Sequence, residues 1–242
     1  MTERILRTAA RAGIEDIAQR VLGGERLSHD DGLRLYAADL HAVGALANWR
    51  REQLHGDLTY FNVNQHINYT NWCNKFCSFC SFDRLPGQKD AYKLEPKEAA
   101  AKIREHLDEP VTEVHMVAGV WPKIPYDYFL DLLRAVKAAK PSIHIKAFTM
   151  VEIDQIWKKA RQEGRREALA DVLADLREAG LGSCPGGGAE IFSDRVHQAG
   201  YKNKISGSEW LDLARQVHQA GIRTNCTMLH GHMETLEERV DH

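Results

Sequence analysis

Residues 67–84 read "INYTNWCNKFCSFCSFDR" and hold three of the five cysteines in the chain. Cys73, Cys77 and Cys80 form a C-x3-C-x2-C array. A closed zinc site takes four ligands, and a [4Fe–4S] cluster is normally held by four cysteines, so the array is one ligand short of either site. A cluster held by three thiolates leaves one iron free to bind a substrate or cofactor, and this is the site that the array predicts.

Other ligands and other interpretations of the array stay open. His66 is a possible fourth ligand for zinc, but it lies in the preceding strand, seven residues before Cys73. Cys184 and Cys226, each at the end of a different strand, remain candidates for the open ligand position, but both are expected to be small buried residues. Zinc or unligated thiols are therefore the alternatives to an iron–sulfur cluster.

The composition is that of a soluble globular protein, because 43% of the 242 residues are hydrophobic and 27% are charged. The net charge is −2, so no excess of positive charge indicates nucleic acid or an acidic membrane surface as a partner. The sequence has no run of about 18 apolar residues, so it predicts no helix that spans a membrane. The first residues, "MTERILRTAARAGIEDIAQR", lack the apolar region of a secretory signal, so we expect a cytoplasmic protein with free thiols.

Hydrophobic spacing divides the chain into a helical part and an alternating part. Residues 13–55 carry apolar side chains at helical spacing, and residues 28–31 predict a capping box. We expect residues 1–57 to form an N-terminal helical segment and residues 58–242 to form the core domain. The strands expected in the core are 60–70, 113–119, 143–148, 181–184 and 221–229, and the helices are 96–109, 126–140, a long one ending at 180, and one around 210–218.

Alternating strands and helices with right-handed crossovers predict a parallel sheet. The unusual segments follow the strand ends, namely the cysteines, "AGVWP", "TMVEI", "CPGGGAEI" and "HGHMET". Because active sites lie at these ends, so many separate contributors favour a barrel over an open sheet. The predicted fold class is α/β, a TIM-like (β/α) barrel. Five strands cannot close an eight-stranded barrel, so we expect the N-terminal part of a longer protein, truncated after about five strands.

The array, its place after the first strand of a parallel barrel, and Phe79 just before the last cysteine resemble the radical S-adenosylmethionine (radical SAM) superfamily. The resemblance implies a TIM-like radical SAM barrel in which Cys73, Cys77 and Cys80 ligate a [4Fe–4S] cluster. The amino and carboxylate groups of S-adenosylmethionine would chelate the open iron. An external electron donor, flavodoxin- or ferredoxin-like, would reduce the cluster, and cleavage of the sulfonium would give a 5′-deoxyadenosyl radical.

Longer segments within residues 30–242 resemble the futalosine-pathway enzymes of menaquinone biosynthesis; they include "NQHINYTNWCNKFCSFCSF", "KAFTMVEI", "PGGGAEIF" and "TNCTMLHGHMETLEERVDH". That family holds an aminofutalosine synthase and a dehypoxanthine-futalosine cyclase, and "GLGSCPGGGAEIF" is more similar to the synthase. The synthase activity implies that the radical adds to 3-[(1-carboxyvinyl)oxy]benzoate, a small-molecule substrate, to give 6-amino-6-deoxyfutalosine. The cyclase, which abstracts hydrogen, is the alternative within the family, and a zinc-binding scaffold is the alternative from another class.

The resemblance also implies cofactor contacts. Ala118 and Gly119, in "HMVAGVWP", stand where the superfamily has a glycine-rich turn against the methionine amine of the cofactor. The family usually has two glycines there, and an alanine resists positive φ. Glu152, in "KAFTMVEI", is expected either to accept hydrogen bonds from ribose hydroxyls or to begin the next helix. Phe79 completes the expected cofactor-binding set.

Substrate contacts are expected from two later segments. Gly186, Gly187 and Gly188 let the main chain pass close to a ligand and expose N–H groups, and Glu190 follows them as the expected catalytic and substrate-binding acid. In "HGHMET", His232 is the second expected catalytic residue, and Glu234 is expected near the substrate. A histidine at a strand end is more often part of the hydrogen-bonded scaffold, and that remains the alternative. The sequence carries no expectation about the oligomeric state.

Overall fold

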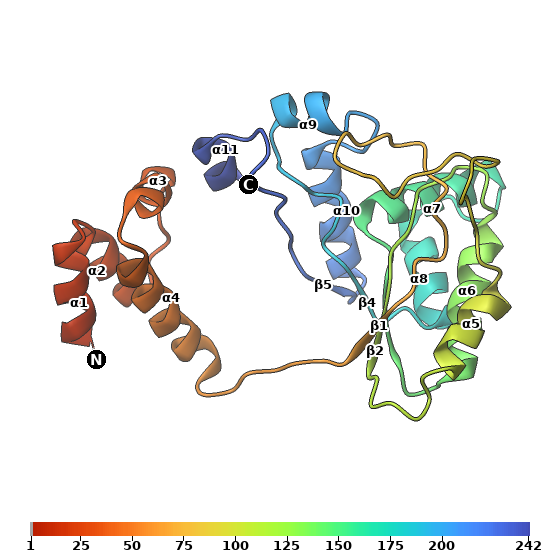
Figure 1. Cartoon of the computed structure of the whole chain (residues 1–242), viewed down its shortest axis with the longest axis horizontal. Helices are drawn as coiled ribbons and strands as arrows, with labels where there is room; N and C mark the ends of the chain where they lie inside the picture. The colour runs from red at the N-terminus through yellow and green to blue at the C-terminus, as the bar shows by residue number, and fades with distance from the viewer. Residues whose placement is uncertain (1) are drawn as a thin grey trace. The chain divides into compact units, whose positions relative to one another are not determined.

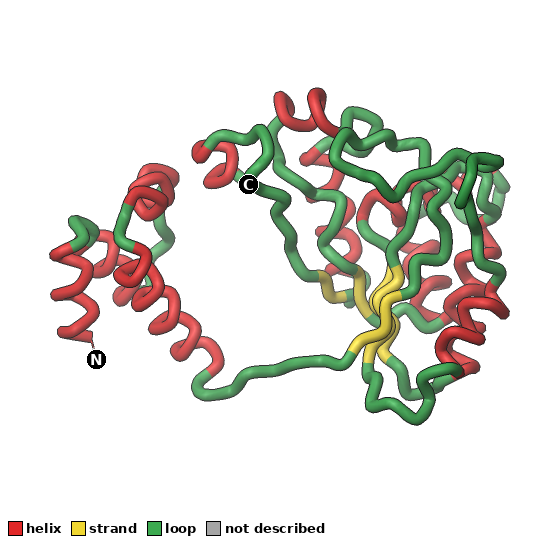
Figure 2. Tube along the Cα trace, viewed as in Figure 1, coloured by secondary structure: helices red, strands yellow, loops and turns green. Residues whose placement is uncertain are grey.

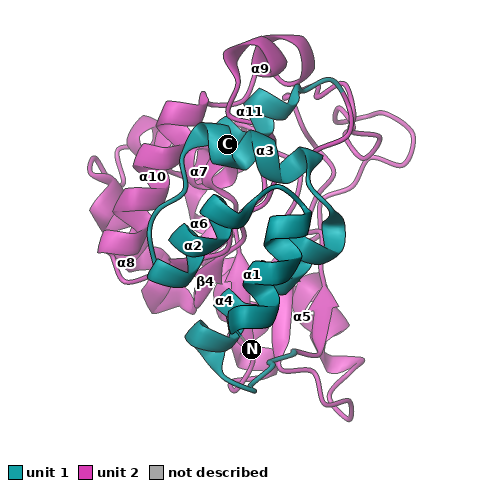
Figure 3. Cartoon of the chain, turned by 90° about the vertical axis from the view of Figure 1, so that its left-hand side faces the viewer, with its two compact units in different colours: residues 1–61, 233–242 teal, residues 62–232 magenta. Residues whose placement is uncertain are grey.

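The structure is a computed structural model that describes residues 2–242. It has two compact units, coloured separately in Figure 3. Asn62–His232 form the larger unit, and the described residues before Asn62 form the smaller unit together with Met233–His242. The division into domains at residues 57 and 58 stays a prediction; the compact units divide after Phe61.

The smaller unit is helical (Figure 1). Its helices are α1 (Thr2–Arg11), α2 (Glu15–Gly23), α3 (His29–Ala37), α4 (Leu40–His55) and α11 (Leu236–Asp241). The helical spacing of residues 13–55 is confirmed, and the segment is divided into α2, α3 and α4. Gly24, at φ +76°, ends α2, and the predicted capping box is present, because the Asp31 carboxylate accepts from the Ser28 N–H while Ser28 Oγ accepts from the Asp31 N–H.

Apolar faces hold these helices together. Buried Ile5, Ile17 and Leu46 bring α1, α2 and α4 into one core. At the surface, Arg34 of α3 donates two hydrogen bonds of 2.7 Å to the carboxylate of Asp16. These contacts lower the pKa of Asp16 to about 2.

The larger unit alternates strands and helices, and Figure 2 shows its strands in yellow. The strands are β1 (Asn64–His66), β2 (Glu113–Met116), β3 (His144–Ala147), β4 (Ser183–Cys184) and β5 (Arg223–Thr224). The helices are α5 (Pro96–Arg104), α6 (Tyr126–Ala139), α7 (Met150–Gln162), α8 (Leu169–Ala179), α9 (Asp194–Gly200) and α10 (Gly207–Gln219).

The five strands form one parallel sheet in the order β1-β2-β3-β4-β5. The strand order follows the chain without a reversal. Right-handed crossovers then place all connecting helices on the same face, which is the winding of a barrel, whereas a doubly wound sheet reverses its order at a switch point. The predicted α/β fold of the TIM-like type is confirmed.

Several elements differ from those expected, and the fifth strand covers only Arg223–Thr224 instead of 221–229. The first strand covers Asn64–His66 instead of 60–70, because β1 is an edge strand that, within residues 2–242, forms a ladder with the short β2 alone. The long helix expected before residue 180 is two helices, since Gly164 turns the chain at φ +65° between α7 and α8. Helix α9, which begins at the capping residue Ser193, was not predicted.

The core of the larger unit lies between the sheet and the helices. Alternate strand residues such as Val114, Met116, Ile145 and Ala147 are fully buried in it. They pack with apolar side chains of α6, α7 and α8. The same strands therefore present their remaining side chains to the opposite face of the sheet.

This packing predicts a large difference between a core and a surface truncation. Ile145→Ala removes side-chain atoms that are completely buried and should lower the free energy of unfolding by about 2–5 kcal/mol. Leu211→Ala, on α10, truncates a side chain that is 47% exposed and should change it by about 0.5 kcal/mol or less. Urea denaturation followed by circular dichroism measures both, and equal losses would contradict the assigned core.

Candidate active site

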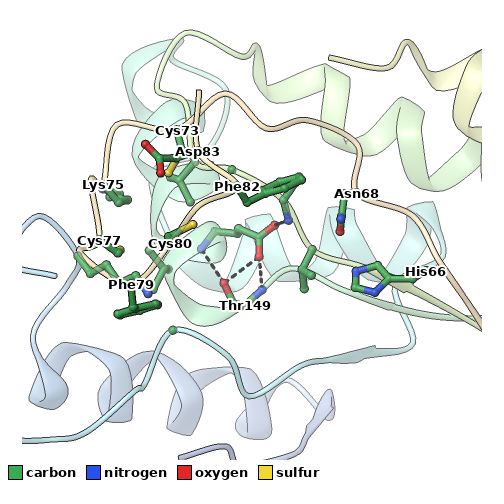
Figure 4. A pocket seen from close by; sticks show the side chains of 18 residues that line it. His66, Asn68, Cys73, Lys75, Cys77, Phe79, Cys80, Phe82, Asp83 and Thr149 are labelled. Carbon is green, nitrogen blue, oxygen red and sulfur yellow. Dashed lines mark hydrogen bonds between the residues drawn. The ribbon is translucent and has the colours of Figure 1, made fainter. Parts of the chain in front are cut away.

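A cavity of about 320 Å³ lies in the larger unit, at the carboxyl ends of β1, β2 and β3 (Figure 4). All three predicted cluster ligands line this cavity: Cys73, Cys77 and Cys80. The four predicted cofactor contacts line it as well: Phe79, Ala118, Gly119 and Glu152. The structure thus brings together residues from three separate segments, while their individual roles stay predictions.

Main-chain hydrogen bonds fix the cysteine loop at several points. The N–H of Cys73 donates to the carbonyl of Arg84 at 3.0 Å, and that of Ser78 donates to the carbonyl of Gly200 at 2.8 Å. Between the first two cysteines, Phe76 has φ +49°. A non-glycine residue in this region costs on the order of 1–3 kcal/mol and persists only where its surroundings hold it. The loop is therefore a constrained structure rather than a loose connection.

The turn after β2 lies directly against the base of this loop. The N–H of Gly119 donates to the carbonyl of Thr70 at 2.9 Å. A Cβ at Gly119 would stand 2.4 Å from the carbonyl oxygen of Trp72, so this position requires glycine. Ala118 has no positive φ, and its N–H donates to Glu152. The alanine that replaces a glycine of the family pattern is therefore accommodated without backbone strain.

Glu152 is 3% exposed, and its carboxylate accepts four hydrogen bonds. Oε1 accepts from the Tyr69 hydroxyl at 2.6 Å and from the Ala118 N–H at 3.1 Å. Oε2 accepts from the N–H and the hydroxyl of Thr149, each at 2.8 Å. A carboxylate offers about four acceptor sites, so these donors fill it. Burial raises the pKa of Glu152, and the hydrogen bonds oppose that shift.

The expectation that Glu152 begins the next helix is confirmed, because it forms the capping box of α7 with Thr149. A contact between Glu152 and a ribose stays a prediction. The donors come from the ends of three strands: Tyr69 follows β1, Ala118 follows β2 and Thr149 follows β3. One buried carboxylate thus fixes the relative positions of the segments that carry the cysteines and the Ala118–Gly119 turn.

Lys204 is a lining residue of the cavity that sequence reasoning missed. Its ammonium group pairs with the carboxylate of Glu190 and lies 5.4 Å from the ring centroid of Phe79. Glu190, at φ +50°, supports Lys204 and is not itself among the lining residues. A lysine that follows a helix, away from every strand end, gives no signal in the sequence.

The glycine segment after β4 packs against neighbouring main chain, and one of its glycines also lines the cavity. A Cβ at Gly186 would stand 2.1 Å from the carbonyl oxygen of Asn225. Gly188 lines the cavity at φ +86°, and the carbonyl of Gly187 accepts from the indole N–H of Trp210 at 3.3 Å. Close packing alone accounts for Gly186, and substrate contacts from the three glycines stay predictions.

The two remaining predicted residues lie elsewhere. His232 is exposed, with its ring nitrogen 3.0 Å from the carbonyl oxygen of Leu229. The side chain of Glu234 is buried in the smaller unit, where it pairs with Arg239. The structure gives Glu234 a structural partner, and the catalytic and substrate roles of both residues stay predictions.

The fifth cysteine corrects an expectation. Cys184 is buried as predicted, and burial raises its thiol pKa to about 12, so it is an inert packing residue. Cys226 is exposed, so the expectation that it is buried was wrong; it follows the two-residue edge strand β5, where few neighbours cover it.

Figure 4 places His66 on the side of the cavity away from the cysteines.

The donor set fits an iron–sulfur cluster. Three thiols share one cavity, and beside Cys73 the buried Trp72 Nε1 has no hydrogen-bond partner within residues 2–242. Cysteine thiolates are the ligands that iron–sulfur clusters normally take in proteins. In the part of the chain that is described, no three histidine, cysteine or acidic side chains are grouped closely enough to hold a metal ion. Ligation therefore requires the three thiols to turn toward one another.

The sequence profile of the Radical SAM superfamily matches residues 67–242, so the chain belongs to this superfamily. Its enzymes use a [4Fe–4S] cluster and S-adenosylmethionine, which confirms the predicted cofactors at the level of the superfamily. The fold is similar to that of the solved structure of methylornithine synthase, with a TM-score of 0.68 and 16% sequence identity. The similar region includes 92% of this chain and 61% of the methylornithine synthase chain. That similarity supports the fold alone.

Two curated relatives show which enzymes the chain is similar to in sequence. The chain is 45% identical to aminodeoxyfutalosine synthase of Thermus thermophilus over 93% of its own length and 60% of that enzyme. It is 37% identical to cyclic dehypoxanthine futalosine synthase of Halalkalibacterium halodurans over 95% of its own length and 61% of that enzyme. The chain thus spans about 60% of the length of these relatives. Among residues 2–242, no helix is both long and apolar enough to cross a bilayer.

The carboxylate that links the three strand ends makes a prediction about stability. Glu152→Gln replaces an acceptor by an amide that also donates, so at least one of the four donors loses its partner inside the protein. We expect the free energy of unfolding to fall by about 1–3 kcal/mol, measured by urea denaturation.

Glu209→Gln is the matched control, because Glu209 occupies the same capping-box position in α10 but is exposed. The Glu209→Gln substitution should lower the free energy of unfolding by about 0.5 kcal/mol or less. If the two substitutions cost the same, Glu152 does not hold the strand ends together.

Proposed function

We propose that this chain carries the cluster-binding part of a radical SAM aminodeoxyfutalosine synthase. The observation that carries the proposal is the cavity in which Cys73, Cys77 and Cys80 meet the Ala118–Gly119 turn. The 45% identity to a synthase supports the particular reaction. Because the chain spans about 60% of that relative, the activity of the whole protein belongs to the proposal.

The three cysteines are proposed to hold a [4Fe–4S] cluster with one open iron. When bound, the reduced cluster and S-adenosylmethionine supply a 5′-deoxyadenosyl radical. The turn is suited to one end of that cofactor, because the N–H groups of Ala118 and Gly119 already donate within the protein. The main chain there offers a ligand only carbonyl oxygens, which suit an ammonium group such as the methionine amine. Phe79 and Glu152 complete the proposed cofactor site.

The proposed substrate is 3-[(1-carboxyvinyl)oxy]benzoate, and the proposed product is 6-amino-6-deoxyfutalosine. Gly186–Gly188, Glu190 and Glu234 are proposed to face the substrate, with Glu190 and His232 as catalytic residues. Glu190 would act through Lys204, which it holds at the cavity. A flavodoxin- or ferredoxin-like electron donor and a cytoplasmic location are part of the same proposal.

Product analysis tests this function. The protein is reconstituted anaerobically with iron and sulfide, then incubated with S-adenosylmethionine, a reductant and the enol-ether dicarboxylate, and the products are read by mass spectrometry. A synthase incorporates the purine into the product, whereas a cyclase acting on its own substrate releases free 5′-deoxyadenosine. Wild-type protein that binds zinc without iron, or a loaded protein that forms no purine-containing product, contradicts the proposal.

Cysteine variants assign the metal site in the same experiment. Cys73→Ser, Cys77→Ser and Cys80→Ser should each lose most of the bound iron and lower product formation by at least about 100-fold, because each removes a thiolate ligand. Cys226→Ser is the matched control, since this thiol is exposed and does not line the cavity. It should retain the iron content and activity of the wild type. Equal iron loss in the control would contradict the assignment.

A further inference from the structure

The cross-strand register aligns one polar row over the whole sheet. His66 of β1 is paired with His115 of β2, which is paired with Lys146 of β3. Lys146 is paired in turn with Ser183 of β4, and Ser183 with Arg223 of β5. Paired residues of neighbouring strands point to the same face of a sheet, so the row His66–His115–Lys146–Ser183–Arg223 shares one face.

Burial identifies that face. The residues flanking the row, such as Val114, Ile145 and Cys184, are buried in the core beneath the helices. Side chains alternate along a strand, so the row lies on the face away from the helices. His66 and Arg223 are exposed and the others are half-buried, which agrees with an uncovered face.

The row is basic and compact. The rings of His66 and His115 are stacked, with centroids 5.1 Å apart and planes 12° apart. Burial and the nearby charges of His66 and Lys146 lower the pKa of His115, while Glu113, one step along the same face, opposes this. Within residues 2–242, neither Lys146 nor Arg223 has an ion pair. Lys146 and Arg223 supply the positive charge of this row, and with Glu113 as the one acid beside His115 the row is suited to an anion.

The interior face of a parallel barrel is usually filled by branched apolar side chains. A polar row in that place is suited to contact with a ligand rather than to a packed core. The row also reaches the cysteine cavity, because His66 belongs to both. An anion bound along it would therefore lie next to the proposed site of radical formation.

We propose that Lys146 and Arg223, with His66 and His115, bind the two carboxylates of the substrate on the interior face of the sheet. This inference rests on the proposed function. The two cations lie two strands apart, or about 10 Å. That spacing suits a dianion whose carboxylates are separated by an aromatic ring better than it suits a single small anion. The row thus determines specificity by charge and spacing.

The test measures binding and turnover separately. Lys146→Gln should raise the KM for the enol-ether dicarboxylate, and its Kd in equilibrium dialysis, by about 10- to 100-fold, because a charged hydrogen bond is lost. The KM for S-adenosylmethionine and the iron content should stay unchanged, and Lys146→Arg should restore part of the affinity. Lys102→Gln, on the exposed surface of α5, is the matched control and should behave as the wild type.

The outcomes separate this inference from the proposed function. A wild type that makes the purine-containing product, with unchanged KM and Kd in Lys146→Gln, overturns the basic row but not the function. A wild type that forms no product, yet binds benzene-1,3-dicarboxylate with an affinity that Lys146→Gln reduces, supports the row and contradicts the function. A wild type that binds neither dicarboxylate overturns the row.

Discussion

The architecture of the site depends on one buried carboxylate. Glu152 accepts hydrogen bonds from groups that follow β1, β2 and β3, and these bonds fix the three strand ends relative to one another. Gly119 then allows the turn after β2 to approach the cysteine loop more closely than any side chain would permit. Removing a carboxylate from water is unfavourable, so its burial is tolerated only because its acceptor sites are filled. The cavity lies between the cysteine loop and the strand ends that Glu152 holds together.

The two faces of the sheet carry different kinds of side chains. On one face, apolar side chains pack beneath the helices and provide the core. On the other face, the basic row extends from the cysteine cavity across all five strands. Strands buried on both faces read as continuous apolar runs, but here basic residues alternate with apolar ones, and that alternation is visible in "IHIKAF". One short strand thus contributes to the core and to the basic row together.

Local patterns predicted much of this arrangement. The order of strands and helices follows from hydrophobic spacing, and the cysteine array identifies the superfamily before any coordinates are known. Lys204 could not be found in this way, because its position at the cavity depends on how the chain after α9 folds back. The four hydrogen bonds of Glu152 could not be predicted together, since two of them come from Tyr69 and Ala118, which only the sheet brings close to the capping residue Thr149. Strand lengths were overestimated where an edge strand has a single short partner.

The central claim is that the protein leaves one iron of a [4Fe–4S] cluster open for S-adenosylmethionine. Electron–nuclear double resonance on the reduced, reconstituted protein tests it directly, with the cofactor labelled with ¹⁵N in its methionine amine. We predict a cluster signal that changes on addition of the cofactor and shows hyperfine coupling to the labelled nitrogen. A spectrum that is unchanged by the cofactor, or a cluster whose four irons are all ligated by protein atoms, would contradict the account.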